Sequence, residues 1–533
     1  LVLWIGYLQW HFKVNGEGKV PPEPVLRDVK TIENRDALIS WDKKVLERDE
    51  HGKPLSIWDG TTMKRHPVTN ELVPDETGRM ELYRYVNPKQ AKWPKATFIV
   101  GNPPFIGNKR MRQRLGDGYT EAVRKAYSKT SESVDFVMYW WDVAGKGAES
   151  VTRRFGFITT NSITQPFNRA VIEHSKSRLL YAIADHPWVD GVDGAAVRIA
   201  LTCAGMEKTP GKLAIVESEK ELPDGYGEKA VQLRFQTVPE INSDLAEGTD
   251  TSATDRLKSN SNLSHQGMTL VGKGFRLTPD EARQFSANVP ENDPIIRPYI
   301  IGRDITGRRE ERYVIDAFGK SESELRDQYP ELYQVLLNNV KPERDQNHRA
   351  SYRQKWWIYA EPRQDLRRCA LGLSKFIATC RTAKHRIFSF EPVLTLPDAK
   401  VIFVGLEDGF HLGVLTSKIH QCWAFRTGGW LGVGNDSNYN HSDCFGKFPF
   451  PANFPEPLKA RIRAEAEALD VLRKQVLAAH DDLTLTGLYN VLEALKAGRA
   501  LTDKERDIHD RGLVTLIRQH HDAIDSAVAD AYG

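Results

Sequence analysis

The chain has 533 residues and a mass of 60.4 kDa, which is too long for one hydrophobic core and predicts several domains. A hydrophobic fraction of 40% with 27% charged residues is ordinary for a globular protein, and no apolar run approaches the roughly 18 residues of a membrane-spanning helix. Abundant aromatic residues exclude wholesale disorder, and a net charge of only +3 means that any surface for an acidic partner must be local.

The sequence gives no sign of a disulfide framework or a metal site. The five cysteines are scattered, odd in number and without a CxxC pair, which favours a reducing cytoplasm. The histidines His411, His420 and His441 lack metal-ligand spacing, so we expect them to be packing or surface residues and predict no bound metal.

The first half of the chain alternates strand-like and helical stretches, which is typical of an α/β layer fold. It starts at Leu1 rather than Met, and we expect the chain to begin within a domain. The apolar segment 1–12 lacks a basic leader and a cleavage site, so it predicts a buried helix. Strands are expected at 97–100, 155–159, 197–203 and 213–216, and helices at 120–127, 134–143 and 170–177.

The second half begins after a polar stretch, 244–266, which predicts a linker or a polar surface excursion. A helix should start at Thr278, because Pro279 suits the first helical position and Glu281 completes a capping box. Further strands are expected at 312–316, 375–379 and 401–405, and helices at 459–479, 485–495 and 513–529. The expected domains are 1–240, 241–290 as a linker and lead-in, 291–452, and 453–533.

The most informative segment is a hydrophobic strand followed by Asn102-Pro103-Pro104-Phe105. Open α/β sheets bind ligands at the carboxyl ends of their strands. The prolines stiffen the turn, so the Asn102 side-chain oxygen and the Pro103 carbonyl can accept hydrogen bonds from an exocyclic amino group. Phe105 offers a face on which a planar base can stack. This arrangement positions an amino nitrogen for methylation; the alternative is an ordinary proline-rich loop.

The motif resembles the catalytic (D/N/S)PP(Y/F) motif of S-adenosylmethionine-dependent amino-methyltransferases, in the variant of the adenine-N6 enzymes. Other segments resemble the type IIG/IIL restriction–modification polypeptides of the MmeI-like family, namely 107–116, 133–141, 154–164, 193–200, 296–306, 313–316, 431–436 and 444–451. The resemblance implies a partial Rossmann-like methyltransferase domain, an α+β target-recognition domain and a C-terminal helical segment. In this family, Asn102 and Phe105, with Pro103 and Pro104 between them, would be the methyl-transfer residues.

The same resemblance implies S-adenosylmethionine as the cofactor. Residues 34–38 resemble a cofactor element in which Asp36 would accept a hydrogen bond from the adenine amino group; an aspartate of a surface turn or of a helix start is the alternative for Asp36. The family's Gly-rich cofactor turn, its nuclease and its helical connector are not found in the sequence. We therefore expect an inactive fragment of a larger bacterial enzyme, whose partner is the missing amino-terminal region of the same polypeptide.

Residues 341–390 concentrate basic side chains, with 12 Lys and Arg against four Asp and Glu. Such a segment suits phosphate contacts with duplex DNA, and a solvated basic face is the alternative. The polar residues 428–440 predict a base-reading loop containing Asn435, or equally a structural turn. The candidate phosphate contacts are Arg349, Arg353, Lys355, Arg381 and Lys384.

Together these features predict a monomeric, site-specific DNA adenine-N6 methyltransferase of a restriction–modification or phage-defence system, acting on duplex DNA and not on a membrane. One alternative is methylation of a protein glutamine side chain, which uses the same type of motif in small enzymes without a long basic appendage. Another is a DNA-specificity module whose motif is a relic. The terminal helices carry a leucine stripe and should pack on the recognition domain, with a protein-partner surface as the alternative.

Overall fold

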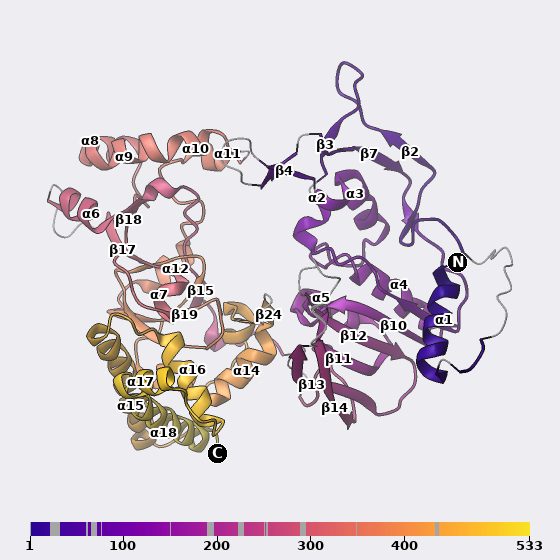
Figure 1. The fold of residues 1–533 in the computed structure, drawn as a ribbon. Coiled ribbons are helices and arrows are strands. Elements are labelled where there is room, and N and C mark those ends of the chain that lie inside the picture. Colours follow the sequence, from indigo (N-terminus) through magenta and orange to yellow (C-terminus); the bar gives the residue numbers. More distant parts are fainter. Residues whose placement is uncertain are drawn as a thin grey trace. The chain divides into compact units, whose positions relative to one another are not determined.

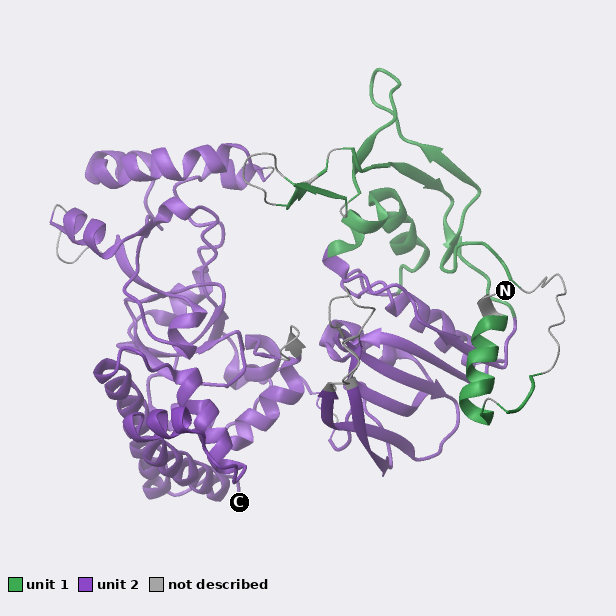
Figure 2. Ribbon diagram, in the orientation of Figure 1, with its two compact units in different colours: residues 1–94, 110–129 green, residues 95–109, 130–533 purple. Residues whose placement is uncertain are grey.

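The computed structural model describes most of the chain, namely residues 2–16, 18–21, 32–59, 62–65, 72–75, 77–149, 151–188, 197–221, 229–249, 251, 254–287, 295–347, 349–431 and 436–533. It divides into two compact units, Leu1–Pro94 with Arg110–Lys129 and Lys95–Lys109 with Thr130–Gly533 (Figure 2). The fold mixes helices and strands, as the sequence predicts. Among the described residues, no helix has the length and apolarity needed to cross a bilayer.

The first unit contains small antiparallel strand pairs and short helices (Figure 1). Strand β1 pairs with β8, β2 with β7, β3 with β6, and β4 with β5. Gly118 is needed where helix α3 meets β7, because a Cβ there would lie 1.7 Å from the Tyr83 carbonyl oxygen. The elements are α1 (Val2–Asn15), β1 (Ile39–Ser40), β2 (Lys43–Leu46), β3 (Ser56–Trp58), β4 (Met63–Arg65), β5 (Leu72–Pro74), β6 (Arg79–Glu81), β7 (Tyr83–Val86), β8 (Lys89–Gln90), α2 (Met111–Leu115) and α3 (Asp117–Ala126).

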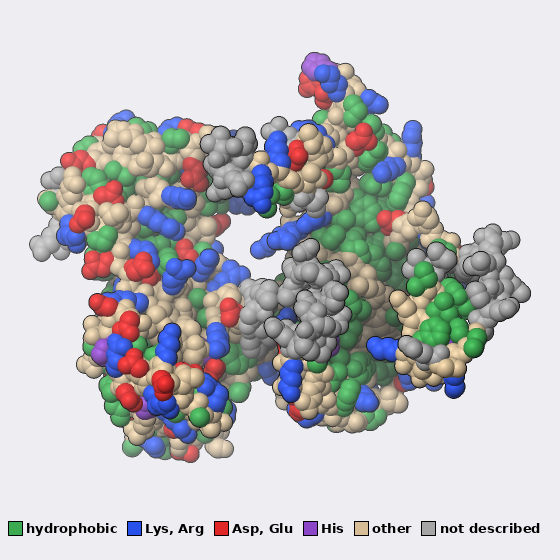
Figure 3. All heavy atoms as spheres, viewed as in Figure 1, with side chains coloured by type: hydrophobic (Ala, Val, Ile, Leu, Met, Phe, Trp, Pro, Cys, Tyr) green, Lys and Arg blue, Asp and Glu red, His purple; other side chains and the backbone are tan. Residues whose placement is uncertain are grey.

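Helix α1 forms where the sequence predicts a helix, but the prediction that it is buried is wrong. Trp10 is 55% exposed and Val14 is 60% exposed, and Ile5 and Phe12 are also exposed. Figure 3 shows hydrophobic side chains on the outer surface of this helix. Apolar residues on every side of a helix allow it to be buried, but burial requires a packing partner. Among the described residues, none packs over these exposed side chains of α1.

The second unit begins with a mixed six-stranded sheet in the order β14-β13-β11-β12-β10-β9. Neighbours β9 and β10 are parallel, as are β11 and β13, while the other neighbours are antiparallel. Trp141 of α4 is fully buried and meets Phe155 of β10 edge-on, with ring centroids 4.8 Å apart. The elements are β9 (Phe98–Gly101), α4 (Met138–Ala148), β10 (Arg154–Thr160), α5 (Pro166–His174), β11 (Arg178–Trp188), β12 (Val197–Gly205), β13 (Gly211–Glu221) and β14 (Lys229–Val238).

The four strands expected in this sheet are confirmed, whereas β11 and β14 are not predicted. The apolar run of β11 ends in Asp185-His186-Pro187, which hides its extended course in the sequence. Helix α5 begins at Pro166, four residues before the expected start, because proline is well suited to the first turn.

The rest of the second unit carries smaller sheets. In the described residues their strand orders are β15-β23-β19-β21, β16-β18-β17-β22 and β20-β25-β24. Thr278 caps α6 with the expected capping box. The elements are β15 (Ser264–Gln266), β16 (Arg276–Leu277), α6 (Pro279–Ser286), β17 (Ile296–Ile300), α7 (Gly302–Thr306), β18 (Tyr313–Ile315), α8 (Glu322–Gln328), α9 (Pro330–Asn339), α10 (Lys341–Asp345), α11 (Ala350–Gln354), α12 (Gln364–Ala370), β19 (Lys375–Cys380), β20 (Thr382–Ala383), β21 (Phe388–Pro392), β22 (Leu396–Pro397), β23 (Val401–Val404), α13 (Gly409–Thr416), α14 (Lys418–Gly428), β24 (Trp430–Leu431) and β25 (Asp436–Asn438).

The C-terminal helices share one hydrophobic core with the sheet β15-β23-β19-β21. They are α15 (Glu456–Ala479), α16 (Leu485–Lys496), α17 (Asp503–Arg511) and α18 (Val514–Tyr532). Ile462, Leu488 and Ile524 are fully buried in the same cluster as Phe388 of β21 and Val404 of β23. The expectation that these helices pack on the preceding domain is therefore confirmed. Figure 3 shows acidic and basic side chains intermixed on their outer surface.

The polar stretch 244–266 is packed against its surroundings rather than extended in solvent. Leu245 is 2% exposed, and Asn260 donates hydrogen bonds to the carbonyls of Phe445 and Phe448 at 3.0 and 2.7 Å. Side chains such as Leu245 and Asn260 attach this stretch to neighbouring segments, and its polar composition does not predict such contacts.

Candidate functional site

Strand β9 delivers the Asn-Pro-Pro-Phe motif at its carboxyl end. Among the described strands it lies at the edge of the six-stranded sheet and pairs with β10, and Gly101 is opposite Phe157 in the last register pair. Residues 102–107 then leave regular structure. Pro103 is buried, while Asn102 is exposed and Phe105 is 37% exposed. The buried proline anchors the turn, and the two side chains with predicted roles face outward from it.

The two acceptors of the motif have no hydrogen-bond partner in the part of the chain that the structure describes. Among the described residues, neither the Asn102 side chain nor the Pro103 carbonyl makes a hydrogen bond, whereas the Pro104 carbonyl accepts one from the Ile106 amide at 3.1 Å. Polar groups in folded proteins are normally paired with protein or solvent. An amide oxygen and a carbonyl held at a stiff strand end can therefore accept hydrogen bonds from a ligand.

The predicted cofactor residue Asp36 already has a role in the first unit. Its Oδ1 accepts hydrogen bonds from the amides of Leu38 and Ile39, both at 2.8 Å, and its Oδ2 accepts one from the Tyr119 hydroxyl at 2.7 Å. Burial, together with this carboxylate, raises the pKa of Tyr119. Asp36 thus shapes a turn, and lone pairs of Oδ2 remain available because, among the described residues, one donor reaches that oxygen.

Several of the basic residues in 341–390 are internal. Arg344 is fully buried and donates to the carbonyls of Leu270 and Ile358 at 2.7 and 3.1 Å. Buried Arg386 donates to the Ser437 carbonyl at 2.9 Å, and burial lowers the pKa of both guanidinium groups. These arginines hold loops together, so charge counting overstates the cations that a ligand can reach.

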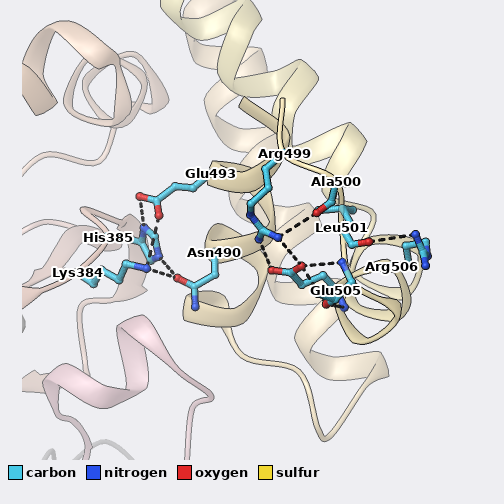
Figure 4. Close-up of polar contacts among 10 residues, drawn as sticks. Lys384, His385, Asn490, Glu493, Arg499, Ala500, Leu501, Glu505 and Arg506 are labelled. Carbon is cyan, nitrogen blue, oxygen red and sulfur yellow. Dashed lines mark hydrogen bonds and ion pairs between the residues drawn. The ribbon is translucent and has the colours of Figure 1, made fainter. Parts of the chain in front are cut away.

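The predicted phosphate contacts differ in availability. Arg349, Arg353 and Lys355 are exposed around α11, and none of them pairs with an acidic side chain among the described residues. Figure 4 shows Lys384 directed toward α16, where its Nζ donates to Asn490 Oδ1 at 2.7 Å and lies 3.5 Å from Glu493. Asn435, the predicted base-reading residue, lies outside the described residues.

Arg381 belongs to a group that sequence reasoning missed. Its amide donates to the Lys400 carbonyl at 2.7 Å, and Gly302, next to Arg303, lies against both Lys400 and Cys380. Within the described residues, the side chains of Arg303, Arg381 and Lys400 make no hydrogen bond or ion pair; we call them the cationic trio. Their wide separation in the sequence leaves no signal, because only the fold brings them together.

No cluster of three or more His, Cys, Asp or Glu side chains suited to a metal ion occurs in the part of the chain that the structure describes. His420 is completely buried against Phe388, Tyr439 and Phe448, as expected of a packing residue.

Comparison with protein families gives two matches in chain order. Residues 2–212 match the model described as MmeI, DNA-methyltransferase domain, and residues 251–452 match that described as MmeI, target recognition domain. The chain belongs to the MmeI family. The methyltransferase match contains Asp36 and the Asn-Pro-Pro-Phe motif, and it implies a methyl donor; the recognition match contains the cationic trio.

Relatives of this MmeI-family chain are longer than it is. DNA methyltransferase A of Bacillus subtilis (strain 168) is 22% identical over an alignment of 474 residues, and the match covers 82% of this chain and 49% of that protein. The structure of the type IIL restriction–modification enzyme MmeI in complex with DNA aligns with a TM-score of 0.62 and 19% identity, over 82% of this chain and 54% of that one. The chain thus spans about half the length of these relatives, and the structural similarity supports the fold.

Proposed function

We propose that this chain supplies the methyl-transfer and target-recognition parts of a monomeric DNA adenine-N6 methyltransferase of a restriction–modification or phage-defence system. The observation that carries the proposal is the Asn-Pro-Pro-Phe turn at the end of β9, with an exposed aromatic ring and two acceptors that no described residue pairs with. A target-recognition domain follows it in the same chain, which favours a nucleic acid over a protein glutamine as the substrate.

The motif can prepare an exocyclic amino nitrogen for attack. The two N–H groups of the substrate amino group would donate to Asn102 Oδ1 and the Pro103 carbonyl. These bonds would draw the nitrogen lone pair out of conjugation with the base and direct it outward. Phe105 would stack on the base after it leaves the duplex, at an unstacking cost of a few kcal/mol. S-Adenosylmethionine supplies an electrophilic methyl group when bound. The nitrogen held by Asn102 and Pro103 would accept that methyl group, with the methyl–sulfur electron pair leaving on sulfur, and would then release one proton to solvent.

Asp36 fits one contact to that cofactor but not a whole site. The free lone pairs of its Oδ2 could accept from an adenine amino group, while the described residues contain no Gly-rich turn after a strand. Phe98 and Val100 lie on the same face of β9 and are 59% and 88% exposed, so the described residues leave that face of the strand uncovered. We propose that a segment outside these 533 residues completes the cofactor site.

This proposal predicts that the isolated chain binds S-adenosylmethionine very weakly, because Asp36 alone contacts one edge of the cofactor. Calorimetric titration of the chain is expected to show no saturation at micromolar cofactor, whereas the full-length protein should bind. Micromolar affinity for the isolated chain would contradict the prediction.

Duplex DNA is the proposed partner of the unpaired cations. The cationic trio can neutralise phosphates without first breaking an ion pair, as can Arg349, Arg353 and Lys355. Lys384 would have to leave Asn490 and Glu493 first, so it is the weakest of the proposed phosphate contacts.

The deciding experiment identifies the product. The full-length protein is incubated with duplex DNA and isotope-labelled methyl donor, and the digested nucleosides are separated by mass spectrometry. We expect label in N6-methyladenine. Label in N4-methylcytosine would overturn the adenine assignment, and label only in protein would overturn DNA as the substrate.

A further inference from the structure

The buried carboxylate of Asp135 joins three segments next to the Asn-Pro-Pro-Phe motif. Asp135 is 8% exposed, and its Oδ1 accepts a hydrogen bond from the Asn108 amide at 2.9 Å. Its Oδ2 accepts from the Ser162 hydroxyl at 2.6 Å and from Asn168 Nδ2 at 2.9 Å. Among the described residues, no Lys, Arg or His pairs with this carboxylate, so hydrogen bonds alone hold its charge.

The partners of Asp135 are themselves fixed. Asn168 on α5 is fully buried; its Oδ1 accepts from the Asp135 amide at 2.9 Å, and its Nδ2 also donates to the Ser162 carbonyl at 2.8 Å. The Phe136 amide donates to the Ile106 carbonyl at 2.9 Å. The loop after the motif is therefore tied to the turn before α4, to the residues after β10 and to α5.

We propose that Asp135 is a positioning residue for methyl transfer; this inference rests on the proposed function. The motif is anchored upstream by the pairing of Gly101 with Phe157 and downstream by the bond from Asn108 to Asp135. Residues 102–105 lie between these anchors. The carboxylate thereby sets the direction of the Asn102 amide and the Pro103 carbonyl without touching the substrate. Reaction rates are sensitive to misplacement of this kind even when binding is unchanged.

The chemistry of the partners requires a carboxylate at this position. All three groups that face its oxygens are used as donors, namely the Asn108 amide, the Ser162 hydroxyl and the Asn168 Nδ2. An asparagine at 135 would turn its own NH₂ toward either the Asn108 amide or Asn168 Nδ2. One donor would then face another in either orientation, although the side chain keeps its size.

The test compares Asp135→Asn with a matched buried aspartate. Asp316 is 7% exposed in the recognition domain and accepts two hydrogen bonds from Arg367, at 2.7 and 2.8 Å, so Asp316→Asn also removes a buried charge. Each full-length variant is assayed for single-turnover methyl transfer with DNA and S-adenosylmethionine saturating, for DNA affinity, and for thermal unfolding. The transfer rate is measured at a temperature where every variant is fully folded.

We expect Asp135→Asn to slow transfer about 100-fold with DNA affinity within about twofold, as for a misplaced reacting group. Asp316→Asn should lower the unfolding temperature and leave the transfer rate of the folded protein unchanged. Ser162→Ala removes one donor of three and should slow transfer by less, which keeps the inference testable if Asp135→Asn does not fold. A wild-type transfer rate in Asp135→Asn, or in Ser162→Ala if the former is unfolded, would overturn it. Absence of DNA methylation by the wild-type protein would instead refute the proposed function.

Discussion

The end of β9 and the basic segment 341–390 differ in what the fold does with their polar atoms. At the end of β9, the Asn102 amide and the Pro103 carbonyl make no hydrogen bond with any described residue. In the basic segment, Arg344 and Arg386 are buried donors to backbone carbonyls. The motif is short and stiffened by two prolines, and its acceptors have no partner among the described residues. A count of charges says little, because each long side chain finds its partner through the tertiary fold.

The first prediction tests the free acceptors of the motif and carries the largest expected effect. Asn102→Ala in the full-length protein should lower the rate of methyl transfer by about 100-fold to 1000-fold, the usual effect of removing a polarising group from a reacting centre. DNA affinity should be unchanged, because phosphate contacts are proposed only in the recognition half. Single-turnover transfer and equilibrium DNA binding measure the two quantities. A variant that transfers normally would reduce the motif to a proline-rich loop.

The second prediction tests the buried donors of the basic segment. Arg344→Ala removes hydrogen bonds to the Leu270 and Ile358 carbonyls and leaves a cavity where a fully buried side chain was, so the free energy of unfolding should fall by about 3 kcal/mol. Arg349→Ala is the matched change at an exposed position and should alter it by less than about 0.5 kcal/mol. Denaturant unfolding of both variants gives the comparison. Equal changes in the free energy of unfolding would mean that burial does not decide how much each of these arginines contributes to stability.

Elements with local signals were predictable from the sequence. The capping box at Thr278, the strand before Asn102 and the long C-terminal helices each depend on residues within one or two turns of one another. The short strands of 39–90 could not be predicted, because they span two to four residues and are mostly not buried, which leaves no apolar periodicity.

Properties that depend on a distant partner could not be predicted. The prediction of a helix at α1 is confirmed, whereas the prediction that this helix is buried is wrong, because burial depends on what packs against it. The cationic trio comes from α7, the residue after β19 and the residue before β23, so no window of sequence contains it. Asp135 lies in a segment identified only by resemblance, and its role becomes visible when Asn108, Ser162 and Asn168 are seen to converge on it.

The third prediction separates unpaired from paired cations. Changing Arg303, Arg381 and Lys400 together to Ala should weaken binding to all DNA sequences alike and flatten the salt dependence by roughly 0.9 log units per lost phosphate contact. The control changes Arg326, Lys341 and Arg368, which lie beside Asp327, Asp345 and Asp365, and removes the same net charge. Affinity is measured over a salt series. If both triple variants have the same slope, net charge rather than availability governs binding.

The last and smallest effect concerns the buried ring of His420 in the recognition half. Its Nε2 lies 3.0 Å from the Tyr439 hydroxyl, and burial, with a smaller contribution from Arg386, lowers its pKa to about 3. The unfolded chain has the ordinary value of about 6.5, so between these values the unfolded state binds a proton that the folded state does not. The stability from neutral His420 is therefore complete above pH 6.5 and is lost as the pH falls.

His420→Gln removes this titration and keeps a polar group for Tyr439. We expect its free energy of unfolding to fall less steeply than that of the wild type, by roughly 1 kcal/mol between about pH 6 and pH 5. His521, also buried and with a pKa lowered to about 3, remains in both proteins, so the difference reports His420 alone. Denaturant unfolding at the two pH values supplies the numbers. Parallel pH dependences would show that His420 is protonated within the fold, and the recognition half would then hold a buried cation where its packing indicates a neutral ring.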